Sequence, residues 1–479
     1  MATRRATKIV ATLGPASSDP QLLEAMIRAG VNVVRLNFSH GKAQDHIDRA
    51  ATVRAAAQRA GREVAIMADL QGPKIRVGKF ADGKVFLEPG AKFVLDASRT
   101  EPGDINGVGL DYKELPRDVK AGDLLLLNDG LIVLTVDAVR GEEVHTTVKL
   151  GGELSNNKGI NKQGGGLTAP ALTAKDMEDI RTAMSFQADY VAVSFPKNAT
   201  DMEMARQLCN VAAAEYRHKP GLIAKIERAE AIPHLEAILR ASDGIMVARG
   251  DLAVEVGNAA VPALQKKMIR MARDMDKVVI TATQMMESMI TNPVPTRAEV
   301  SDVANAVLDG TDAVMCSAET AVGAYPFETV RQMAVICAAA EAEQDSLNGV
   351  GESHQEAAVN TNLAIASGAV HVARAIDATA IVALTESGGT AFEISRHSIQ
   401  LPIYAFTPSI SAQRRMAMYR GVRPLMLATS CDHDTALNEV ESMLVERKVL
   451  KSGEQYIVTS GSRMRESGST DMLQVVKVR

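Results

Sequence analysis

The chain has 479 residues, 46% of them hydrophobic, a length too great for one ordinary core and typical of two or three domains. Its 53 basic and 58 acidic residues leave a net charge of −5, while aromatic residues make up 3% and tryptophan is absent. This composition argues against a general nucleic-acid surface and against aromatic platforms for stacked bases.

The cysteines and the apolar runs indicate a cytoplasmic protein. The cysteines lie far apart with no paired spacing, which predicts reduced thiols and neither a disulfide frame nor a zinc site: Cys209, Cys316, Cys337 and Cys431. The first residues hold no long apolar run, and no window approaches the roughly 18 uncharged apolar residues of a membrane helix. We therefore expect no secretion signal and no membrane span.

Short apolar segments alternate with amphipathic helical stretches through most of the chain. The predicted strands cover residues 8–14, 31–38, 64–70, 190–195, 222–227, 244–250, 278–283 and 313–318. Near-continuous apolar runs separated by helices are typical of parallel strands that are covered on both faces. Eight such units predict a closed (β/α)8 TIM barrel. An open, doubly wound sheet is the alternative.

A long insertion interrupts this rhythm after the third strand. Residues 73–167 contain alternating strand patterns and Gly and Asp turns, which predict an all-β domain made of hairpins. Its joints, 71–73 and 163–170, are rich in glycine, which permits hinge bending. We expect a lid over the barrel mouth; a rigid, decorative domain is the alternative.

A second α/β domain with an open sheet follows the barrel. Residues 327–344 predict the helix that closes the barrel, and the polar residues 345–357 predict a linker. Strand patterns then restart at 380–385, 402–407, 423–428 and 455–460. The expected domains are the barrel (1–72 and 168–344), the lid (73–167) and a C-terminal α/β regulatory domain (345–479).

Polar side chains gather where the predicted barrel strands end, which is where chemistry concentrates in such barrels. They are Arg35, Asn37, Asp69, Ser194, Lys225, Glu227, Asp251, Thr283 and Glu319. Burying an unpaired charge costs several kcal/mol, roughly, so this clustering predicts a functional site. A structural ion-pair network that closes the barrel is the alternative.

The spacing of these residues favours a phosphorylated substrate and a hard cation. Lys225 and Glu227 lie two apart and point the same way on a strand, and Glu227 with Asp251 provides two carboxylates for Mg²⁺. Backbone amides at Gly250 suit a small carboxylate; an adhesion tripeptide is the alternative for "RGD". Arg35 suits phosphate, and further basic residues follow at Lys74, Arg76 and Lys158. Any one of these basic residues alone fits a solvated surface position.

The order of several motifs resembles the pyruvate kinase family over essentially the whole chain. The matching stretches are KIVATLGPAS, VVRLNFSHG, DLQGPKIRVG, NNKGINK, KIERAEAI, SDGIMVARGDL, TATQMMESMI, PTRAEVSDVANAVLDGTDAVMCSAETAVGAYP and TESGGT. The resemblance implies Mg²⁺-dependent phosphoryl transfer, with Mn²⁺ as a possible substitute, from phosphoenolpyruvate to ADP. It also implies a homotetramer and a phosphorylated allosteric effector.

The resemblance also implies roles for individual residues. Lys225, Thr283 and Arg35 match the catalytic residues, with Lys225 on the transferring phosphoryl group and Thr283 associated with proton delivery. Glu227 and Asp251 match the divalent metal ligands. The substrate pocket matches Arg35, Lys225, Gly250, Asp251 and Thr283, and the nucleotide contacts match Asn37, Phe38, Ser39, His40, Arg76 and Lys158.

The monovalent cation site departs from the commonest family pattern. Many members hold K⁺ with residues that match Asn37, Ser39, Asp69 and the carbonyl of Leu70, and K⁺-dependent members usually have glutamate at the position of Lys74 and threonine at that of Leu70. Because an ammonium group and K⁺ carry the same charge, we expect Lys74 to replace the ion and K⁺ not to be required.

The C-terminal domain departs in its effector loop. The hydroxyls of Thr385, Ser387 and Thr390 and the amides of Gly388 and Gly389 form a strand–loop–helix pattern that suits phosphate; an empty helix cap is the alternative. Members that respond to fructose 1,6-bisphosphate often have lysine where Glu386 stands. A carboxylate there repels a second phosphate, so we expect a sugar monophosphate or AMP.

Two other functions are alternatives to this one. Another phosphoenolpyruvate-handling barrel enzyme that works through a phosphohistidine needs a mobile histidine in a separate domain, and the nine histidines show no such placement. A non-catalytic effector-binding protein is the second alternative. The intact set Lys225, Glu227, Asp251 and Thr283 argues against it.

Overall fold

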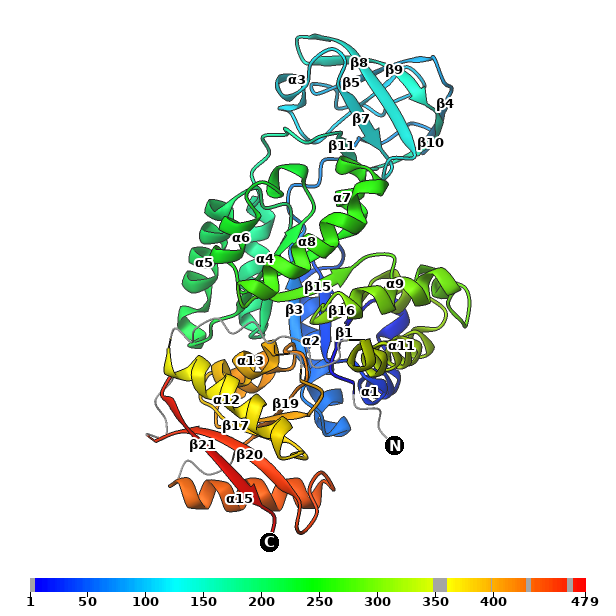
Figure 1. Cartoon of the computed structure of the whole chain (residues 1–479). Coiled ribbons are helices and arrows are strands. Elements are labelled where there is room, and N and C mark those ends of the chain that lie inside the picture. The colour runs from blue at the N-terminus through cyan, green and yellow to red at the C-terminus, as the bar shows by residue number, and fades with distance from the viewer. Residues whose placement is uncertain (1–4, 348–359, 398, 428–431, 463–467) are drawn as a thin grey trace.

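The barrel, the insertion and the C-terminal domain follow one another along the long axis of the molecule, with the barrel in the middle (Figure 1). The computed structural model describes residues 5–347, 360–397, 399–427, 432–462 and 468–479. Cys431 and most of the expected linker, residues 348–357, lie outside the described residues. Among the described helices, none combines the length and the apolarity that crossing a membrane requires.

Eight parallel strands close into a barrel in the order β1-β16-β15-β14-β13-β12-β3-β2, which confirms the predicted fold. Their bounds are β1 (Lys8–Thr12), β2 (Val33–Asn37), β3 (Ala65–Asp69), β12 (Tyr190–Val193), β13 (Gly221–Ile226), β14 (Gly244–Ala248), β15 (Val278–Ala282) and β16 (Ala313–Cys316). Every residue of these strands is buried except two in β2, Arg35 and Asn37. The apolar runs therefore arise because both faces of the sheet are covered.

Helices cover the outside of the barrel. They are α1 (Pro20–Ala29), α2 (Ala43–Ala60), α4 (Ala174–Ser185), α5 (Ala199–Ala213), α6 (Leu235–Ala241), α8 (Val261–Asp274), α9 (Arg297–Leu308) and α11 (Pro326–Leu347). Side-chain caps define several starts: Thr173 and Thr296 form capping boxes for α4 and α9, and Asn198 caps α5. Two shorter helices follow directly on strands, α7 (Arg249–Val256) after β14 and α10 (Ala318–Ala321) after β16.

The insertion after β3 forms two sheets of its own. A six-stranded sheet has the order β11-β7-β8-β9-β5-β6, and β10 pairs with β4. The bounds are β4 (Lys84–Leu87), β5 (Lys92–Asp96), β6 (Gly107–Gly109), β7 (Leu124–Leu127), β8 (Ile132–Arg140), β9 (Glu143–Leu150), β10 (Gly152–Ser155) and β11 (Ile160–Lys162). Its core is separate from the barrel core and includes Leu87, Phe93, Leu125 and Val144.

The C-terminal part is an open sheet with helices. The strand order is β19-β18-β17-β20-β21, parallel except for the pair β20–β21. The bounds are α12 (Thr361–Ala375), β17 (Ile381–Leu384), α13 (Gly389–Arg396), β18 (Ile403–Thr407), α14 (Ile410–Met416), β19 (Val422–Met426), α15 (His433–Glu446), β20 (Gln455–Gly461) and β21 (Thr470–Lys477). Figure 1 places this sheet at the end of the barrel opposite the insertion.

Local predictions differ from the structure in a few places. The strand expected over 244–250 ends at Ala248, and Arg249 and Gly250 begin α7. The insertion expected to be all β contains a short helix, α3 (Leu115–Asp118), and the expected linker begins later because α11 continues to Leu347. The antiparallel strand β21 was not predicted. The domain boundaries at 72/73, 167/168 and 344/345 stay predictions.

Candidate active site

Asp69, the last residue of β3, is the centre of the charged cluster at the barrel mouth. Its side chain is fully buried, its Oδ2 accepts from Arg35 Nε at 2.5 Å, and its Oδ1 lies 3.1 Å from Lys225 Nζ. Burial alone would raise the pKa of Asp69, but the charges of Arg35 and Lys225 outweigh it and hold the pKa below its usual value. Asp69 therefore keeps two cations of the mouth in fixed positions.

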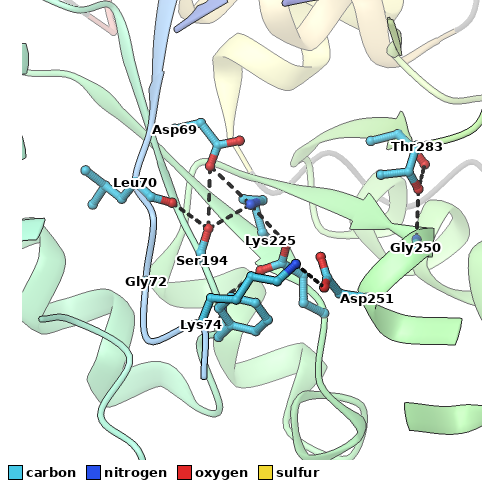
Figure 2. A network of polar contacts seen from close by, with 12 residues as sticks. Asp69, Leu70, Gly72, Lys74, Ser194, Lys225, Gly250, Asp251 and Thr283 are labelled. Atoms are coloured by element: carbon cyan, nitrogen blue, oxygen red, sulfur yellow. Dashed lines mark hydrogen bonds and ion pairs between the residues drawn. The ribbon is translucent and has the colours of Figure 1, made fainter. Parts of the chain in front are cut away.

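Lys225 on β13 contacts Ser194, which follows β12, and Glu227, which follows β13 itself (Figure 2). Its Nζ donates to Ser194 Oγ at 2.7 Å and lies 2.9 Å from Glu227 Oε1. Ser194 Oγ in turn donates to the Leu70 carbonyl at 2.7 Å. Burial lowers the pKa of Lys225 by itself, but Asp69 and Glu227 outweigh it and raise the pKa, so the ammonium form is stable at the bottom of the mouth.

Glu227 and Asp251 are the two carboxylates of the expected metal site. Glu227 Oε2 accepts from Phe195 N at 2.9 Å, and Asp251 Oδ1 lies 3.3 Å from Lys74 Nζ. Burial raises the pKa of Glu227 to about 6; the charge of Lys225 opposes this rise and the like charge of Asp251 adds to it. The charge of Asp251 thus disfavours ionisation of Glu227, a repulsion that a bound cation would relieve.

These donors suit Mg²⁺ without forming a complete protein cage. In the described part of the chain, no group of three or more His, Cys, Asp or Glu side chains is arranged to hold a metal ion. Mg²⁺ typically takes one or two protein carboxylates and leaves its other positions to water and substrate oxygens. In this structure, Lys225 Nζ contacts one oxygen of Glu227, and Lys74 Nζ contacts one oxygen of Asp251. The chemistry of the donor set therefore fits the ion.

The other side of the mouth is built from the starts of α7 and of the loop after β15. Gly250 N donates to Thr283 Oγ1 at 2.9 Å, and Thr283 has a left-handed backbone with φ of +68° (Figure 2). Such a conformation is costly for a β-branched residue and persists only when the surroundings impose it. Arg249 provides that restraint, since its guanidinium donates to the carbonyls of Ala282 at 3.0 Å and Thr283 at 2.5 Å.

The expected nucleotide residues after β2 lie in one tight turn. Ser39 N donates to Asn37 Oδ1 at 3.1 Å, and His40 is exposed. The Phe38 ring is buried and stacks on His46 at 4.0 Å between centroids, so Phe38 can offer a ligand only its backbone. The Phe38 carbonyl already accepts from Lys175 Nζ at 2.8 Å.

Arg76 and Lys158 lie together in the insertion. Arg76 Nη1 donates to Asn157 O at 3.0 Å, and Val77 N donates to Lys158 O at 2.9 Å. Among the described residues, no hydrogen bond or ion pair joins either side chain to the cluster around Asp69. A ligand that reaches both sets of residues would therefore bridge the insertion and the barrel.

Two expected groups have different surroundings from those predicted. Lys74, expected among Asn37, Ser39, Asp69 and Leu70, makes its ion pair with Asp251. Glu319 is buried and accepts from the backbone amides of Met286 at 3.1 Å and Ser317 at 2.6 Å, which is a structural role.

The effector loop is partly occupied by its own contacts. Gly388 N donates to Thr385 Oγ1 at 3.0 Å, and the buried Thr390 hydroxyl bonds to Thr470 Oγ1 at 2.5 Å. Gly388 has φ of +92°, and a Cβ there would meet Met416 Cγ at 2.8 Å, so only glycine fits. Thr390, which was expected to contact phosphate, faces the neighbouring strand β21 instead.

Several residues of this region were not identified from the sequence. Arg249 fixes the Thr283 backbone, and Arg228, Glu230 and Glu255 join the second joint of the insertion to the mouth. Arg228 and Glu230 stand close to Glu227, and Glu255 stands one helical turn after Asp251. That proximity was the available signal, but their partners are distant along the chain.

Comparisons with known proteins agree with this architecture. The sequence matches the family model described as pyruvate kinase, barrel domain, over residues 4–330, and the one described as pyruvate kinase, alpha/beta domain, over residues 363–476. A pyruvate kinase II from Salmonella typhimurium is 51% identical over 479 residues and 99% of each chain, and a pyruvate kinase from Haemophilus influenzae is 48% identical over 464 residues and 96% of each chain.

A solved structure extends the similarity to three dimensions. A pyruvate kinase from Cryptosporidium parvum superposes with a TM-score of 0.92 at 32% sequence identity, covering 100% of this chain and 97% of that chain. Both domains of the family are thus matched in sequence, and the whole fold is matched in space. The chain is a phosphotransferase and belongs to the pyruvate kinase family.

Proposed function

We propose that the protein transfers the phosphoryl group of phosphoenolpyruvate to ADP in the presence of Mg²⁺, and that the cluster at the barrel mouth performs the transfer. The observation that carries this proposal is the charged cluster in which Asp69 pairs with Arg35 and Lys225, and Lys225 pairs with Glu227, in a chain of this family. Phosphoryl transfer needs positioning and neutralisation of spread negative charge, with little covalent work by the protein.

Lys225 and Arg35 supply fixed positive charge to the transferring group. Both are held by the buried Asp69, so their positions are set before substrate binds. Preorganised charge in a dry site stabilises a transition state more than mobile charge in water. Lys225 is the closer of the two to the metal ligand Glu227 and acts on the phosphoryl group and the enolate oxygen.

Glu227 and Asp251 would hold the divalent cation, Mg²⁺ or Mn²⁺. When bound, this ion neutralises negative charge on the phosphoryl and carboxylate oxygens of the substrate. The amides at Gly250 and Asp251 lie at the start of α7, where they would bind the carboxylate of the substrate, with Gly250 N leaving its bond to Thr283 Oγ1. Thr283, whose Oγ1 accepts from Gly250 N and donates to the Ala282 carbonyl, would assist delivery of a proton to the enolate, directly or through water.

The nucleotide would lie between the barrel and the insertion. Asn37, Ser39 and His40 approach from the turn after β2, with the Phe38 backbone, and Arg76 and Lys158 approach from the insertion. Closing the insertion over the mouth brings the two groups together and excludes water, which otherwise hydrolyses the phosphate. A location in the cytoplasm and a homotetramer stay predictions; sedimentation of the full chain tests the latter.

A coupled assay for pyruvate, with phosphoenolpyruvate, ADP and Mg²⁺, tests the activity. We expect turnover that depends on all three components and that is lost in Asp251→Asn. Pyruvate formation without ADP, or undiminished turnover in Asp251→Asn, would contradict the proposal.

We also infer that the protein does not require K⁺. Lys74 places an ammonium group 3.3 Å from Asp251 at the mouth, and Asp69 is already paired with two cations. The positive charge that K⁺ supplies in other members is therefore provided by the chain. We expect equal turnover in Tris free of K⁺ and Na⁺ and in KCl, whereas Lys74→Glu should become K⁺-dependent. Strong K⁺ activation of the unaltered protein would contradict this inference.

The effector is a sugar monophosphate or AMP in this proposal. Ser387 and the amide of Gly389 at the start of α13 support one phosphate, and Glu386 disfavours a second. The amide of Gly388 would join them only by giving up its bond to Thr385 Oγ1. Thr390 is withdrawn from the expected set because its hydroxyl bonds to Thr470. Titration of activity against glucose 6-phosphate, AMP and fructose 1,6-bisphosphate tests this, and the bisphosphate as strongest activator would refute it.

A further inference from the structure

Glu255 links the two segments that carry the proposed metal ligands. It lies on α7, one helical turn after Asp251, and is 5% exposed. Its Oε2 accepts from the backbone amide of Ala229 at 2.8 Å. Ala229 begins the short 3-10 helix Ala229–Ala231, two residues after Glu227. A single carboxylate thus ties the loop of one metal ligand to the helix of the other.

The same residue also contacts the insertion. Gly164 N, at the second joint of the insertion, donates to the Glu255 carbonyl at 3.1 Å. Asp251, Glu255, Lys74 and Asn161 line one pocket between the barrel and the insertion. Glu255 therefore lies where the two metal-ligand segments and the second joint of the insertion meet.

A tie of this kind is needed because Glu227 and Asp251 repel each other. Both side chains are carboxylates, and they lie on the two segments that the Glu255–Ala229 bond joins, so like charges act between these segments. They stand on consecutive strand–helix units, and without a cation their repulsion favours separation of the Ala229 loop from α7. The bond between Glu255 and Ala229 opposes that separation directly.

We propose that Glu255 is a positioning residue that holds Glu227 and Asp251 at the spacing a divalent cation requires. The inference rests on the proposed metal site at those two carboxylates. Groups that orient metal ligands typically change metal affinity by about 10- to 100-fold when they are removed. The proposed site has two protein carboxylates. The distance between them in the metal-free protein therefore decides how far Glu227 and Asp251 must move when the ion binds.

The test measures Mn²⁺ binding directly, without substrates, by the electron paramagnetic resonance signal of free Mn²⁺ in titrations of the full-length protein. Glu255→Ala removes the acceptor and is expected to raise the Mn²⁺ Kd by at least about tenfold. Glu255→Gln keeps an oxygen for the Ala229 amide, so its Kd should stay within about threefold of the unaltered value, on the same scale.

A second variant removes the donor and leaves the carboxylate in place. Ala229→Pro deletes the N–H, and Arg228 already has the extended backbone, φ −116° and ψ 146°, that the residue before proline prefers. We expect it to raise the Kd as Glu255→Ala does. The double variant should be no worse than either single one, because both remove the same bond.

Glu230→Ala is the matched control. Glu230 is also a carboxylate beside the Glu227 loop, and its Oε1 accepts from Gly166 N at the joint of the insertion, without bridging to α7. Its loss should leave the Mn²⁺ Kd unchanged. Equal Kd increases in Glu230→Ala and Glu255→Ala would overturn the proposal, as would an unchanged Kd in folded Glu255→Ala or Ala229→Pro.

Asp251→Asn separates this inference from the function on which it rests. If Asp251→Asn binds Mn²⁺ as tightly as the unaltered protein, the metal site itself is wrong. If Asp251→Asn loses binding while both Glu255→Ala and Ala229→Pro keep it, only the positioning role fails. A higher Kd in all three, with recovery in Glu255→Gln, supports both.

Discussion

At the scale of single residues, the mouth of the barrel is organised by buried opposite charges. Asp69 receives Arg35 and Lys225, and Lys225 also contacts Glu227 and Ser194. Each opposite charge offsets the free energy of burying the others, because burying an unpaired ion costs roughly several kcal/mol. The result is an ammonium group held rigidly where phosphoryl charge would spread.

Replacing Lys225 by methionine should affect turnover far more than substrate affinity. The fixed ammonium group acts on charge that develops in the transition state, so kcat should fall at least ~100-fold while KM changes little. The assay is pyruvate formation under saturating Mg²⁺, with circular dichroism to verify folding. Lys219→Met, at an exposed position, is the control. Near-normal kcat in Lys225→Met would refute the assigned role.

Which residues end the barrel strands was predictable, whereas their pairing was not. Arg35, Lys225, Glu227, Asp251 and Thr283 stand out because charged or hydroxyl groups follow buried apolar runs. The contact of Lys74 with Asp251 spans 177 positions, and no local pattern indicates it. Where a side chain has several possible partners, the register of the strands in the folded barrel determines which of them it contacts.

At the scale of elements, α7 connects the substrate side of the mouth with the insertion. It begins at Arg249, which fixes the Thr283 backbone, carries Asp251 on its first turn, and ends near Glu255. Arg228 completes this region, since its Nη1 donates to Leu167 O at 3.3 Å and its guanidinium lies over the Phe195 ring at 5.5 Å. A movement of the insertion at residues 164–167 must therefore disturb these contacts.

The burial of Glu255 should make stability depend on pH. Burial raises the pKa of Glu255 from 4.5 to about 7; the hydrogen bond from the Ala229 amide opposes this rise and the charge of Glu230 adds to it. Between these values the folded protein binds more protons than the unfolded chain, so stability falls as pH rises through this window. The full ionisation costs roughly 3 kcal/mol.

Glu255→Gln lacks this ionisable group, which gives the measurement. Calorimetric melting in EDTA at pH 5 and pH 8 should show the Tm of Glu255→Gln rising by a few degrees relative to the unaltered protein as pH increases. Glu236→Gln, at an exposed position on α6, is the matched control. A constant Tm difference between pH 5 and pH 8 would show that Glu255 is not held in the protonated form.

At the scale of the whole molecule, the C-terminal sheet is joined to the bottom of the barrel by α13. Arg396, at the end of this helix, makes two bonds to Asp312, one of them 3.1 Å from Nη1 to Oδ2, and Asp312 is fully buried beside β16. Asp312 also accepts from Val279 N at 2.9 Å, so the same carboxylate ties two barrel strands together. The loop at Gly388 begins the same helix.

Removing the Arg396 charge should weaken the attachment of the C-terminal domain. Arg396→Met leaves Asp312 buried without its cation, which costs about 3 kcal/mol or more. We expect a separate unfolding transition at lower urea concentration, followed by tryptic release of the C-terminal fragment. Arg374→Met, at an exposed position on α12, should unfold as the unaltered protein does. Coincident transitions in Arg396→Met would contradict the expected role of this ion pair.

The amino-acid pattern alone determined the fold class and the positions of the polar strand ends. The periodicity of apolar segments predicted a barrel of eight parallel strands, and the order of motifs indicated the family that the comparisons confirm. Burial drives this level, because a strand covered on both faces must be apolar along its whole length. The polar residues at the ends of such strands are therefore recognisable in the sequence, because they interrupt long apolar runs.

Only the tertiary structure decided which groups contact one another. It pairs Lys74 with Asp251, bonds Thr390 to Thr470, and places Glu255 between the Ala229 loop, α7 and the insertion. Each of these contacts joins parts of the chain that are far apart in sequence or belong to separate units. Their energies depend on distance and burial in the folded chain, and neither quantity exists until the strands have closed into the barrel.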